Sequence, residues 1–181
     1  MANFTPSPSW TWLTTNDRLA LRYGVTPSEL KLTPVNALPR SVEAGSAFAF
    51  TLEHAEMFWT FWHALEPLQY AEVGRFAAAI DATACNCFLP QQGQKSWHFQ
   101  PISTHYLPTT GEIVLLAGQS SGLAIVAAAG EQSSVVLILE NLVSLAGKQL
   151  QSGHPILVLN NRMMLWQPQP SIRPQLLPKT A

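Results

Sequence analysis

LPQQGQKSWHF, residues 89–99, is the point where the sequence changes its pattern. Upstream of it, residues 53–66 and 69–87 place apolar side chains at helical spacing. Downstream, short apolar runs are separated by Gly, Asn and Ser, which is typical of strands joined by tight turns. We therefore predict an α+β fold in two parts: an N-terminal α/β part with a hairpin and two helices, and a C-terminal small antiparallel β-barrel-like part.

The N-terminal part is expected to span residues 1–90 and to open with a β-hairpin. SWTWLTTNDRLALRY, residues 9–23, alternates apolar and polar side chains on both sides of Asn16-Asp17, a favourable turn pair. Three prolines between residues 25 and 40 allow short strands there but exclude a long helix. The two predicted helices follow this segment.

The C-terminal part, residues 91–166, is expected to contain roughly six short antiparallel strands. Its strand-like runs are residues 96–100, 112–117, 123–129, 134–139, 142–145 and 156–159. Residues 167–181 contain four prolines and too few apolar side chains to build a core, so we predict a disordered Pro-rich tail.

The charge of the chain limits its partners. With 10 basic and 11 acidic residues its formal net charge is −1, so it lacks the broad positive field of a general nucleic-acid binder. Only 12% of the residues are charged, about half the usual share. This predicts a weakly charged surface that favours association with other molecules. The first ten residues do not resemble a secretory signal, and no uncharged apolar run reaches the roughly 20 residues of a spanning helix. We expect a cytoplasmic protein without membrane insertion.

No residue pattern predicts a catalytic or metal site. Cys85 and Cys87 lie two positions apart on a predicted helix, so their thiols point to opposite sides, and we expect Cys87 in the core. Ser96 and His98 would face the same way along a strand, yet stand roughly 6–7 Å apart. Glycine-rich phosphate loops and the nucleophile elbow of hydrolases do not occur. We therefore predict that the protein is not an enzyme and uses no cofactor or metal.

Large aromatic residues are concentrated in the first third of the chain. They are Trp10, Trp12, Phe58, Trp59, Phe61 and Trp62. Two interpretations stay open: these rings fill a small N-terminal core, or some of them remain exposed and anchor an apolar peptide, as aromatic residues do at protein interfaces.

Two stretches carry a resemblance to a known family. KSWHF, residues 95–99, and LAGKQLQSGHPILVLNNRM, residues 145–163, resemble the bacterial ZapC family, accessory factors of the cell-division Z-ring. The opening SWTWL and the following NDRLALRY are also similar to that family's Trp-x-Trp opening and second strand. The resemblance extends from about residue 9 to residue 166, and the segment between Phe50 and Phe88 is longer and more aromatic than the family pattern.

The resemblance implies a non-enzymatic protein at the division site that binds FtsZ, the tubulin-like division GTPase. It implies that binding favours lateral association of FtsZ filaments, damps GTP turnover and stabilises the Z-ring. The residues expected to contact FtsZ are Leu21, Phe58, Trp59 and Trp62 as apolar anchors, with Lys95 and Arg162 for charge. Alternation along the predicted strand 96–100 puts Trp97 and Phe99 on one face, where we expect them to seal the junction between the two parts.

Filament bundling requires two binding surfaces, and two unlike parts of a monomer would supply them. We expect a monomer, with self-association as the rival scheme. A small-ligand or peptide-binding β-barrel unrelated to division is the alternative function. A third possible function is nucleic-acid binding, in which bases would stack on Trp97 and Phe99 beside Lys95. The near-neutral charge of the chain disfavours it.

Overall fold

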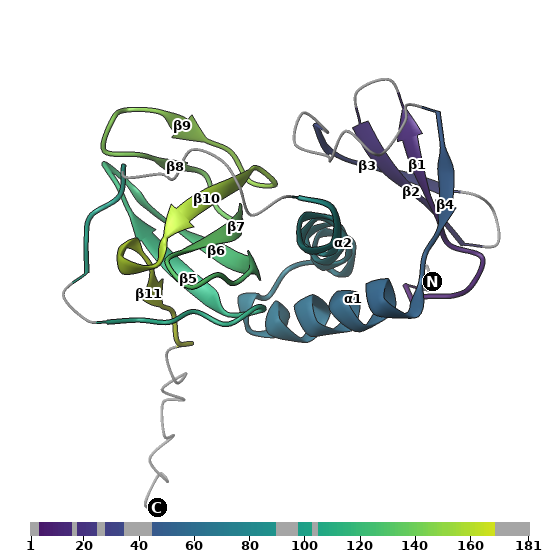
Figure 1. The fold of residues 1–181 in the computed structure, drawn as a ribbon, viewed down its shortest axis with the longest axis horizontal. Helices are drawn as coiled ribbons and strands as arrows, with labels where there is room; N and C mark the ends of the chain where they lie inside the picture. Colours follow the sequence, from purple (N-terminus) through teal and green to yellow (C-terminus); the bar gives the residue numbers. More distant parts are fainter. Residues whose placement is uncertain are drawn as a thin grey trace, which may run out of the picture.

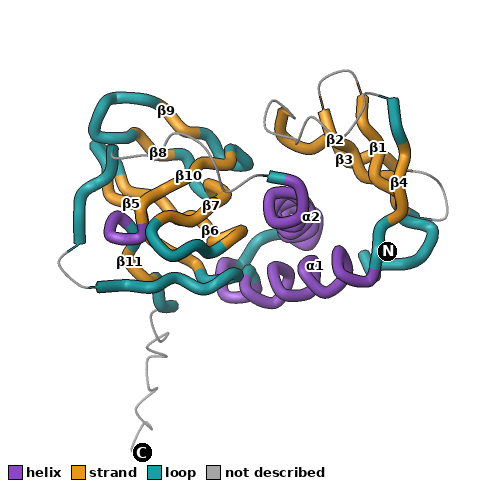
Figure 2. The backbone as a smooth tube through the Cα atoms, in the orientation of Figure 1, coloured by secondary structure: helices purple, strands orange, loops and turns teal. Residues whose placement is uncertain are grey.

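The computed structural model of the protein describes residues 4–15, 18–24, 28–34, 45–89, 98–102 and 105–168. It confirms the α+β class: one antiparallel sheet lies at each end of the molecule and two helices lie between them (Figure 1). Seen as a tube, α2 stands between the two sheets and α1 runs beneath it (Figure 2). Residues 169–181, most of the predicted tail, lie outside the described residues.

The N-terminal sheet contains the predicted hairpin and two further strands. Its strands are β1 (Thr11–Thr15), β2 (Arg18–Tyr23), β3 (Ser28–Pro34) and β4 (Ala47–Ala49), in the order β3-β2-β1-β4. Thr15 pairs with Arg18, so the turn has two residues, as the sequence predicts. The turn residues Asn16 and Asp17 themselves lie outside the described residues.

Two α-helices follow the N-terminal sheet. They are α1 (Leu52–Ala64) and α2 (Glu72–Phe88), with the short 3-10 helix η1 (Glu66–Leu68) between them. Both predicted helices are confirmed with shifted ends: α1 ends at Ala64 and is followed by η1, which contains Pro67, and α2 begins at Glu72 where residue 69 was predicted. In the described part of the chain, neither helix is long and apolar enough to cross a membrane.

The C-terminal sheet has five strands and a small two-stranded ladder beside it. The five strands, in the order β10-β7-β6-β5-β11, are β5 (Ile113–Ala117), β6 (Ser121–Ala128), β7 (Ser133–Ile138), β10 (Pro155–Leu159) and β11 (Met164–Leu165). The ladder pairs β8 (Leu142–Val143) with β9 (Gln149–Leu150), and the 3-10 helix η2 (Asn160–Arg162) precedes β11. Every strand pair is antiparallel.

Five of the six predicted C-terminal runs contain a strand, and the run at residues 96–100 differs. Its described residues, 98–100, have no strand assignment, and residues 96 and 97 lie outside the described part. The backbone N–H of Gln100 still donates to the carbonyl of Ala117, 2.8 Å away. The segment therefore runs past the end of β5 without joining a regular ladder.

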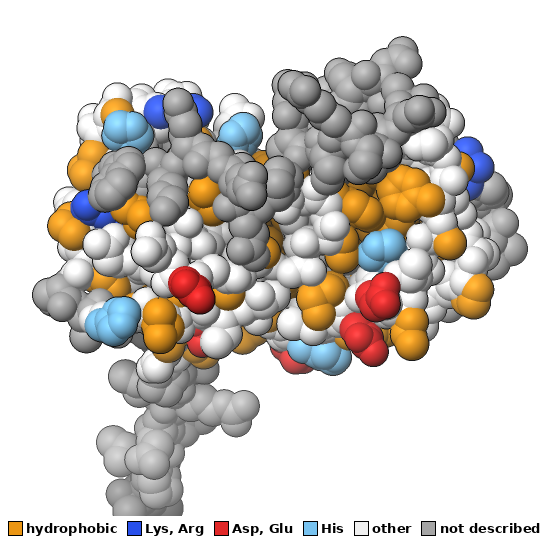
Figure 3. Space-filling model, viewed as in Figure 1, with side chains coloured by type: hydrophobic (Ala, Val, Ile, Leu, Met, Phe, Trp, Pro, Cys, Tyr) orange, Lys and Arg blue, Asp and Glu red, His pale blue; other side chains and the backbone are white. Residues whose placement is uncertain are grey.

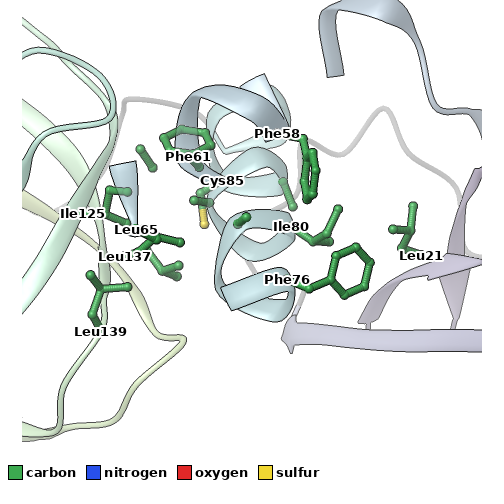
Figure 4. Packing of buried hydrophobic residues seen from close by; sticks show 14 of the residues in the cluster. Leu21, Phe58, Phe61, Leu65, Phe76, Ile80, Cys85, Ile125, Leu137 and Leu139 are labelled. Carbon is green, nitrogen blue, oxygen red and sulfur yellow. The ribbon is translucent and has the colours of Figure 1, made fainter. Parts of the chain in front are cut away.

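The helix α2 is packed on both sides, and this decides where the core lies. In Figure 4, Phe76 and Ile80 point toward Leu21 of the N-terminal sheet, while Leu137 and Ile125 of the C-terminal sheet lie on the opposite side of the helix. One continuous apolar cluster therefore joins the N-terminal sheet, the helices and one face of the C-terminal sheet. We call this the shared core.

The other face of the C-terminal sheet carries a second core. Along β6, Leu123 and Ile125 belong to the shared core, while the alternate residues Ala124 and Val126 belong to the second cluster. This is the period-2 alternation of a strand, with apolar side chains needed on both faces. It explains why β6 shows no polar alternation in the sequence.

Two positional expectations are wrong because of this layering. Cys85 is buried in the shared core and Cys87 is only half-buried, the reverse of the prediction, because α2 contacts elements on two sides and buries more than one stripe. Phe99 is fully buried, but in the second core rather than at the junction between the parts. Trp97, its expected companion, lies outside the described residues.

Polar contacts add to the joint between the helices and the C-terminal sheet. The Asn86 amide donates from Nδ2 to the carbonyl of Ala127 at 2.7 Å, where the β6–β7 register shifts. The Tyr70 hydroxyl donates to the carbonyl of Leu139 at 3.3 Å. Both bonds satisfy carbonyls of the sheet, so they hold the helical layer in one position against it.

Candidate functional site

A group of exposed and half-exposed rings lies on the C-terminal half of α1. Trp59, Trp62 and His63, called the aromatic patch below, are spaced i, i+3 and i+4, which brings them together on one helix surface. The Trp59 and His63 rings stack at 5.7 Å and 24°, and the Trp59 and Trp62 rings meet edge-on at 6.3 Å. Trp59 is 36% exposed, so part of its indole faces solvent.

Buried aromatic rings of the shared core pack against the aromatic patch. Phe58, which is fully buried, has its ring centroid 5.2 Å from that of Trp59 and 5.6 Å from that of Trp62. The Phe4 ring lies 6.4 Å from Trp62. The exposed indole is therefore supported by core side chains and has few alternative positions.

Arg75 of α2 adds a cation at the edge of the patch. Its guanidinium carbon lies 4.4 Å from the centroid of the Trp62 ring, and its Nε donates to the Trp62 carbonyl at 2.7 Å. A guanidinium over an indole is a favourable cation–π arrangement. Nη2 also lies 3.9 Å from Glu66 Oε2; the Glu66 side chain is mostly exposed, so this ion pair contributes little by itself. Arg75 thus fixes α2 against α1 and places positive charge beside an apolar surface.

The structure describes five of the six expected FtsZ-binding residues, and they do not lie together. Trp59 and Trp62 lie in the aromatic patch at the surface. Leu21 and Phe58 are fully buried, so in this structure they support the patch and the core and cannot themselves touch a partner. Lys95 lies outside the described residues.

Arg162 lies apart from the aromatic patch. It is in η2, and its Nη1 donates to the carbonyl of Phe99 at 3.0 Å, on the side of the C-terminal sheet that carries the second core. Its Nε is buried and has no hydrogen-bond partner among the described residues. The sequence-predicted apolar anchors and the cation at 162 therefore belong to different faces of the molecule.

His63 of the patch and Arg75 at its edge were not predicted. His63 could have been found from the sequence, because it lies four positions after Trp59 on a predicted helix. Arg75 could not, because its contact with Trp62 depends on how α2 packs against α1.

The two thiols are poorly suited to nucleophilic chemistry. Burial, with smaller contributions from the Asp81 carboxylate and Cys87, strongly raises the pKa of Cys85. Burial, with a smaller contribution from Glu53, raises the pKa of Cys87 to about 11. Both thiols are therefore protonated at neutral pH, and the thiolate is the reactive form. Within the described ranges, no group of three or more His, Cys, Asp or Glu residues could hold a metal ion.

One face of the molecule carries few charged side chains. Figure 3 shows apolar side chains spread over this face of the molecule with few acidic and basic side chains among them. Such a surface is suited to contacts in which apolar area dominates and a few charges set the orientation.

Comparison with known proteins supports the family resemblance. The C-terminal model of the cell-division protein ZapC family matches residues 90–169. A cell division protein ZapC from Vibrio vulnificus is 32% identical over 166 residues, covering 87% of this chain and 89% of the relative. The chain belongs to the ZapC family. ZapC proteins of Ferrimonas balearica and Musicola paradisiaca are 29% and 24% identical over 166 and 162 residues.

Membership in the ZapC family confirms the resemblance predicted from the sequence and identifies a cell-division protein. The matches to whole ZapC chains cover about nine tenths of both sequences, so they include the aromatic N-terminal half as well as the C-terminal sheet.

Proposed function

We propose that the protein is a non-enzymatic accessory factor that binds FtsZ at the cytoplasmic division site and promotes lateral association of its filaments. ZapC family membership supports the cell-division role. The single observation that carries the contact is the partly exposed indole of Trp59, held by the buried Phe58 ring. A rigid aromatic side chain loses little freedom on binding, which is why such residues anchor interfaces.

The aromatic patch fits a segment of FtsZ that mixes apolar and acidic groups. Apolar groups would cover the Trp59 and Trp62 rings, and a carboxylate would approach Arg75 at the patch edge. The Arg75 side chain is mostly buried, so Arg75 would select the orientation of the partner segment more than it would add affinity. Lys95 and Arg162 were expected to supply charge beside these anchors; because Arg162 lies apart from the aromatic patch, we propose that they serve a second contact.

Bundling follows if one monomer presents two surfaces. The aromatic patch on α1 would contact one filament, and the region of Arg162 on the C-terminal part would contact its neighbour. Two weak contacts on one molecule act together through effective concentration. Measuring the mass of the protein in solution, with and without FtsZ, separates this scheme from self-association, which would show dimers of the free protein.

A ligand-binding barrel has less support. The face of the C-terminal sheet that such a barrel would use to line a pocket is occupied by the second core, in which Val114, Val126 and Val136 are fully buried among other apolar side chains. Packed aliphatic side chains of this kind stabilise the fold and do not form a binding surface.

Co-sedimentation with FtsZ polymers tests the proposed contact. We expect Trp59→Ala to weaken binding by at least about tenfold, because it removes a central aromatic anchor. Leu52→Ala is the matched control, since Leu52 lies on the same helix, is 76% exposed and is outside the patch. If Trp59→Ala binds like the unchanged protein, or if Leu52→Ala loses as much, the patch is not the FtsZ contact.

Charge reversal tests the second contact. Lys95→Glu should reduce filament bundling, seen by light scattering and electron microscopy, while Lys148→Glu, an exposed lysine elsewhere in the C-terminal part, should leave it unchanged. Binding of single filaments through the aromatic patch should survive in the Lys95 variant. Unchanged bundling by Lys95→Glu would remove Lys95 from the site.

A further inference from the structure

His54 occupies an unusual position at the beginning of α1. Thr51 is the N-cap of the helix, and its Oγ1 accepts a hydrogen bond from the His54 backbone N–H at 3.4 Å. In return, the imidazole Nδ1 of His54 accepts from the Thr51 backbone N–H at 2.9 Å. This is a capping box in which histidine takes the place usually held by Glu or Gln.

The same nitrogen has a second donor. The indole Nε1–H of Trp12, a fully buried residue of β1, donates to Nδ1 of His54 at 3.3 Å. Because both neighbours are N–H donors, Nδ1 must carry a lone pair, and the imidazole proton must be on Nε2. One ring nitrogen thus joins the N-terminal sheet to the first turn of α1.

We propose that His54 is a pH-sensitive joint between the N-terminal sheet and α1, closed while its imidazole is neutral and opened when Nδ1 takes up a proton. Protonation at Nδ1 turns the shared acceptor into a donor that faces two other donors. Both hydrogen bonds are lost together, which leaves the Thr51 N–H uncapped and the buried Trp12 indole N–H without its partner.

The surroundings of His54 favour the neutral form. Rings from three segments enclose it: Trp12 of β1 at 5.8 Å, Phe50 before α1 at 5.4 Å and Phe88 of α2 at 5.4 Å between centroids. Among the described residues, the charged group that acts on it is the Glu53 carboxylate on α1.

Burial and charge act in opposite directions on this histidine. Burial lowers the pKa of His54 and outweighs the Glu53 carboxylate, which raises it. The thiol of Cys87 on α2, on which the Glu53 carboxylate also acts, is protonated and neutral because burial raises its pKa to about 11. The β1 and β4 segments contribute no charged side chain, so the joint is closed at neutral pH and opens only in more acidic solution.

The stability consequence has a definite sign. Because the pKa of His54 is lower in the folded protein than its ordinary 6.5, the folded state binds fewer protons than the unfolded state in this range. The contribution of the His54 hydrogen bonds to the free energy of unfolding is therefore complete above pH 6.5. It is lost as the pH falls through the pKa that His54 has in the folded protein. This inference stands independently of FtsZ binding, since it concerns the opposite end of α1 from the aromatic patch.

Nuclear magnetic resonance of the full chain tests the joint directly. Long-range imidazole nitrogen–proton correlations should show His54 as the Nε2–H tautomer at pH 8, with a pKa below 6.5. The Trp12 indole N–H should be protected from hydrogen exchange at pH 8, and its resonance should shift with the same midpoint as His54 on acidification. An Nδ1–H tautomer at pH 8, or an indole resonance that stays unchanged from pH 8 to pH 4.5, overturns the proposal.

Two variants complete the test. His54→Gln retains an acceptor suited to the capping box but cannot titrate, so the Trp12 transition should disappear. His63→Gln changes an exposed histidine of the same helix and should leave the transition intact. Should the Trp12 midpoint be the same in His54→Gln as in the unchanged protein, another group drives it. The tautomer of the unchanged protein decides the question even if His54→Gln folds poorly.

Discussion

The two ends of the molecule build their cores from different side chains. Around the helices the shared core contains many aromatic rings: Phe76 stacks on Phe4 at 4.3 Å and lies 4.8 Å from Tyr23 and 5.8 Å from Trp10. The second core, on the far face of the C-terminal sheet, consists of Val, Leu, Ile and Ala with one buried phenylalanine, Phe99, and one methionine. Both cores exclude water, the shared core largely through contacts between aromatic rings and the second core largely through packed aliphatic side chains.

This difference explains where the candidate site lies. Branched aliphatic side chains on neighbouring strands interlock and close the second core on itself. Flat aromatic rings on a small sheet and two helices overlap edge to face, and the outermost of them, Trp59, is left partly uncovered. The aromatic end thus exposes an indole that buried rings support, whereas the large apolar side chains exposed on the C-terminal part are not aromatic: Leu107, Leu145, Met164 and Leu165.

The largest expected effect comes from truncating the central ring of the aromatic core. Phe76→Ala should lower the free energy of unfolding by about 3–5 kcal/mol. Phe99→Ala in the second core should cost about 1 kcal/mol less, because it loses burial but no comparable set of ring contacts. Urea denaturation of both variants measures the difference. An equal or larger loss for Phe99→Ala would contradict the distinction between the two cores.

A close backbone approach in the aliphatic end is expected to have the next largest effect. A Cβ at Gly118 would overlap the carbonyl oxygen of Val143 and lie 3.0 Å from Cα of Ser144, so the β8 ladder could not keep its place. Gly118→Ala should destabilise the protein by about 1–3 kcal/mol. Gly74→Ala, an exposed helical position with only Tyr70 nearby at 3.9 Å, should instead stabilise by up to about 1 kcal/mol. Thermal unfolding distinguishes the two signs.

The smallest of the three effects is expected at the polar joint between the ends. Asn86→Ala removes the side-chain hydrogen bond to the carbonyl of Ala127 and should lower the free energy of unfolding by about 1 kcal/mol. Tyr70→Phe removes a longer bond, 3.3 Å to Leu139, and should cost less. Hydrogen exchange along β6 and β7 is the measurement, with faster exchange near Ala127 in the Asn86 variant. Equal protection in both variants would mean that apolar packing alone holds the helices to this sheet.

Local patterns were sufficient for most of the elements. The two-residue turn between β1 and β2, both helices and five of the C-terminal strands follow from alternation, helical spacing and the positions of Pro and Gly. The strands β9 and β11, each of two residues, were not predicted. The extended run at residues 96–100 was assigned as a strand because its composition suits one, yet a ladder also needs a partner strand in register.

The candidate site was predictable only in part. Trp59 and Trp62 could be selected as excess aromatic residues, but nothing in the sequence distinguishes them from the equally aromatic Phe58, which is buried one position away. Exposure depends on what packs against each face of α1, and that is a tertiary property.

By itself, the sequence determined the α+β class, the order of most elements and the near-neutral net charge, because these depend on composition and on spacing within short segments; the ZapC family followed instead from the resemblance of particular stretches such as KSWHF, residues 95–99. The tertiary structure alone decided that α2 is packed on two sides, that Cys85 and not Cys87 is in the core, and that Phe99 belongs to the second core. The reason is physical: a local pattern reports that a face is apolar, whereas burial depends on which distant segment covers it.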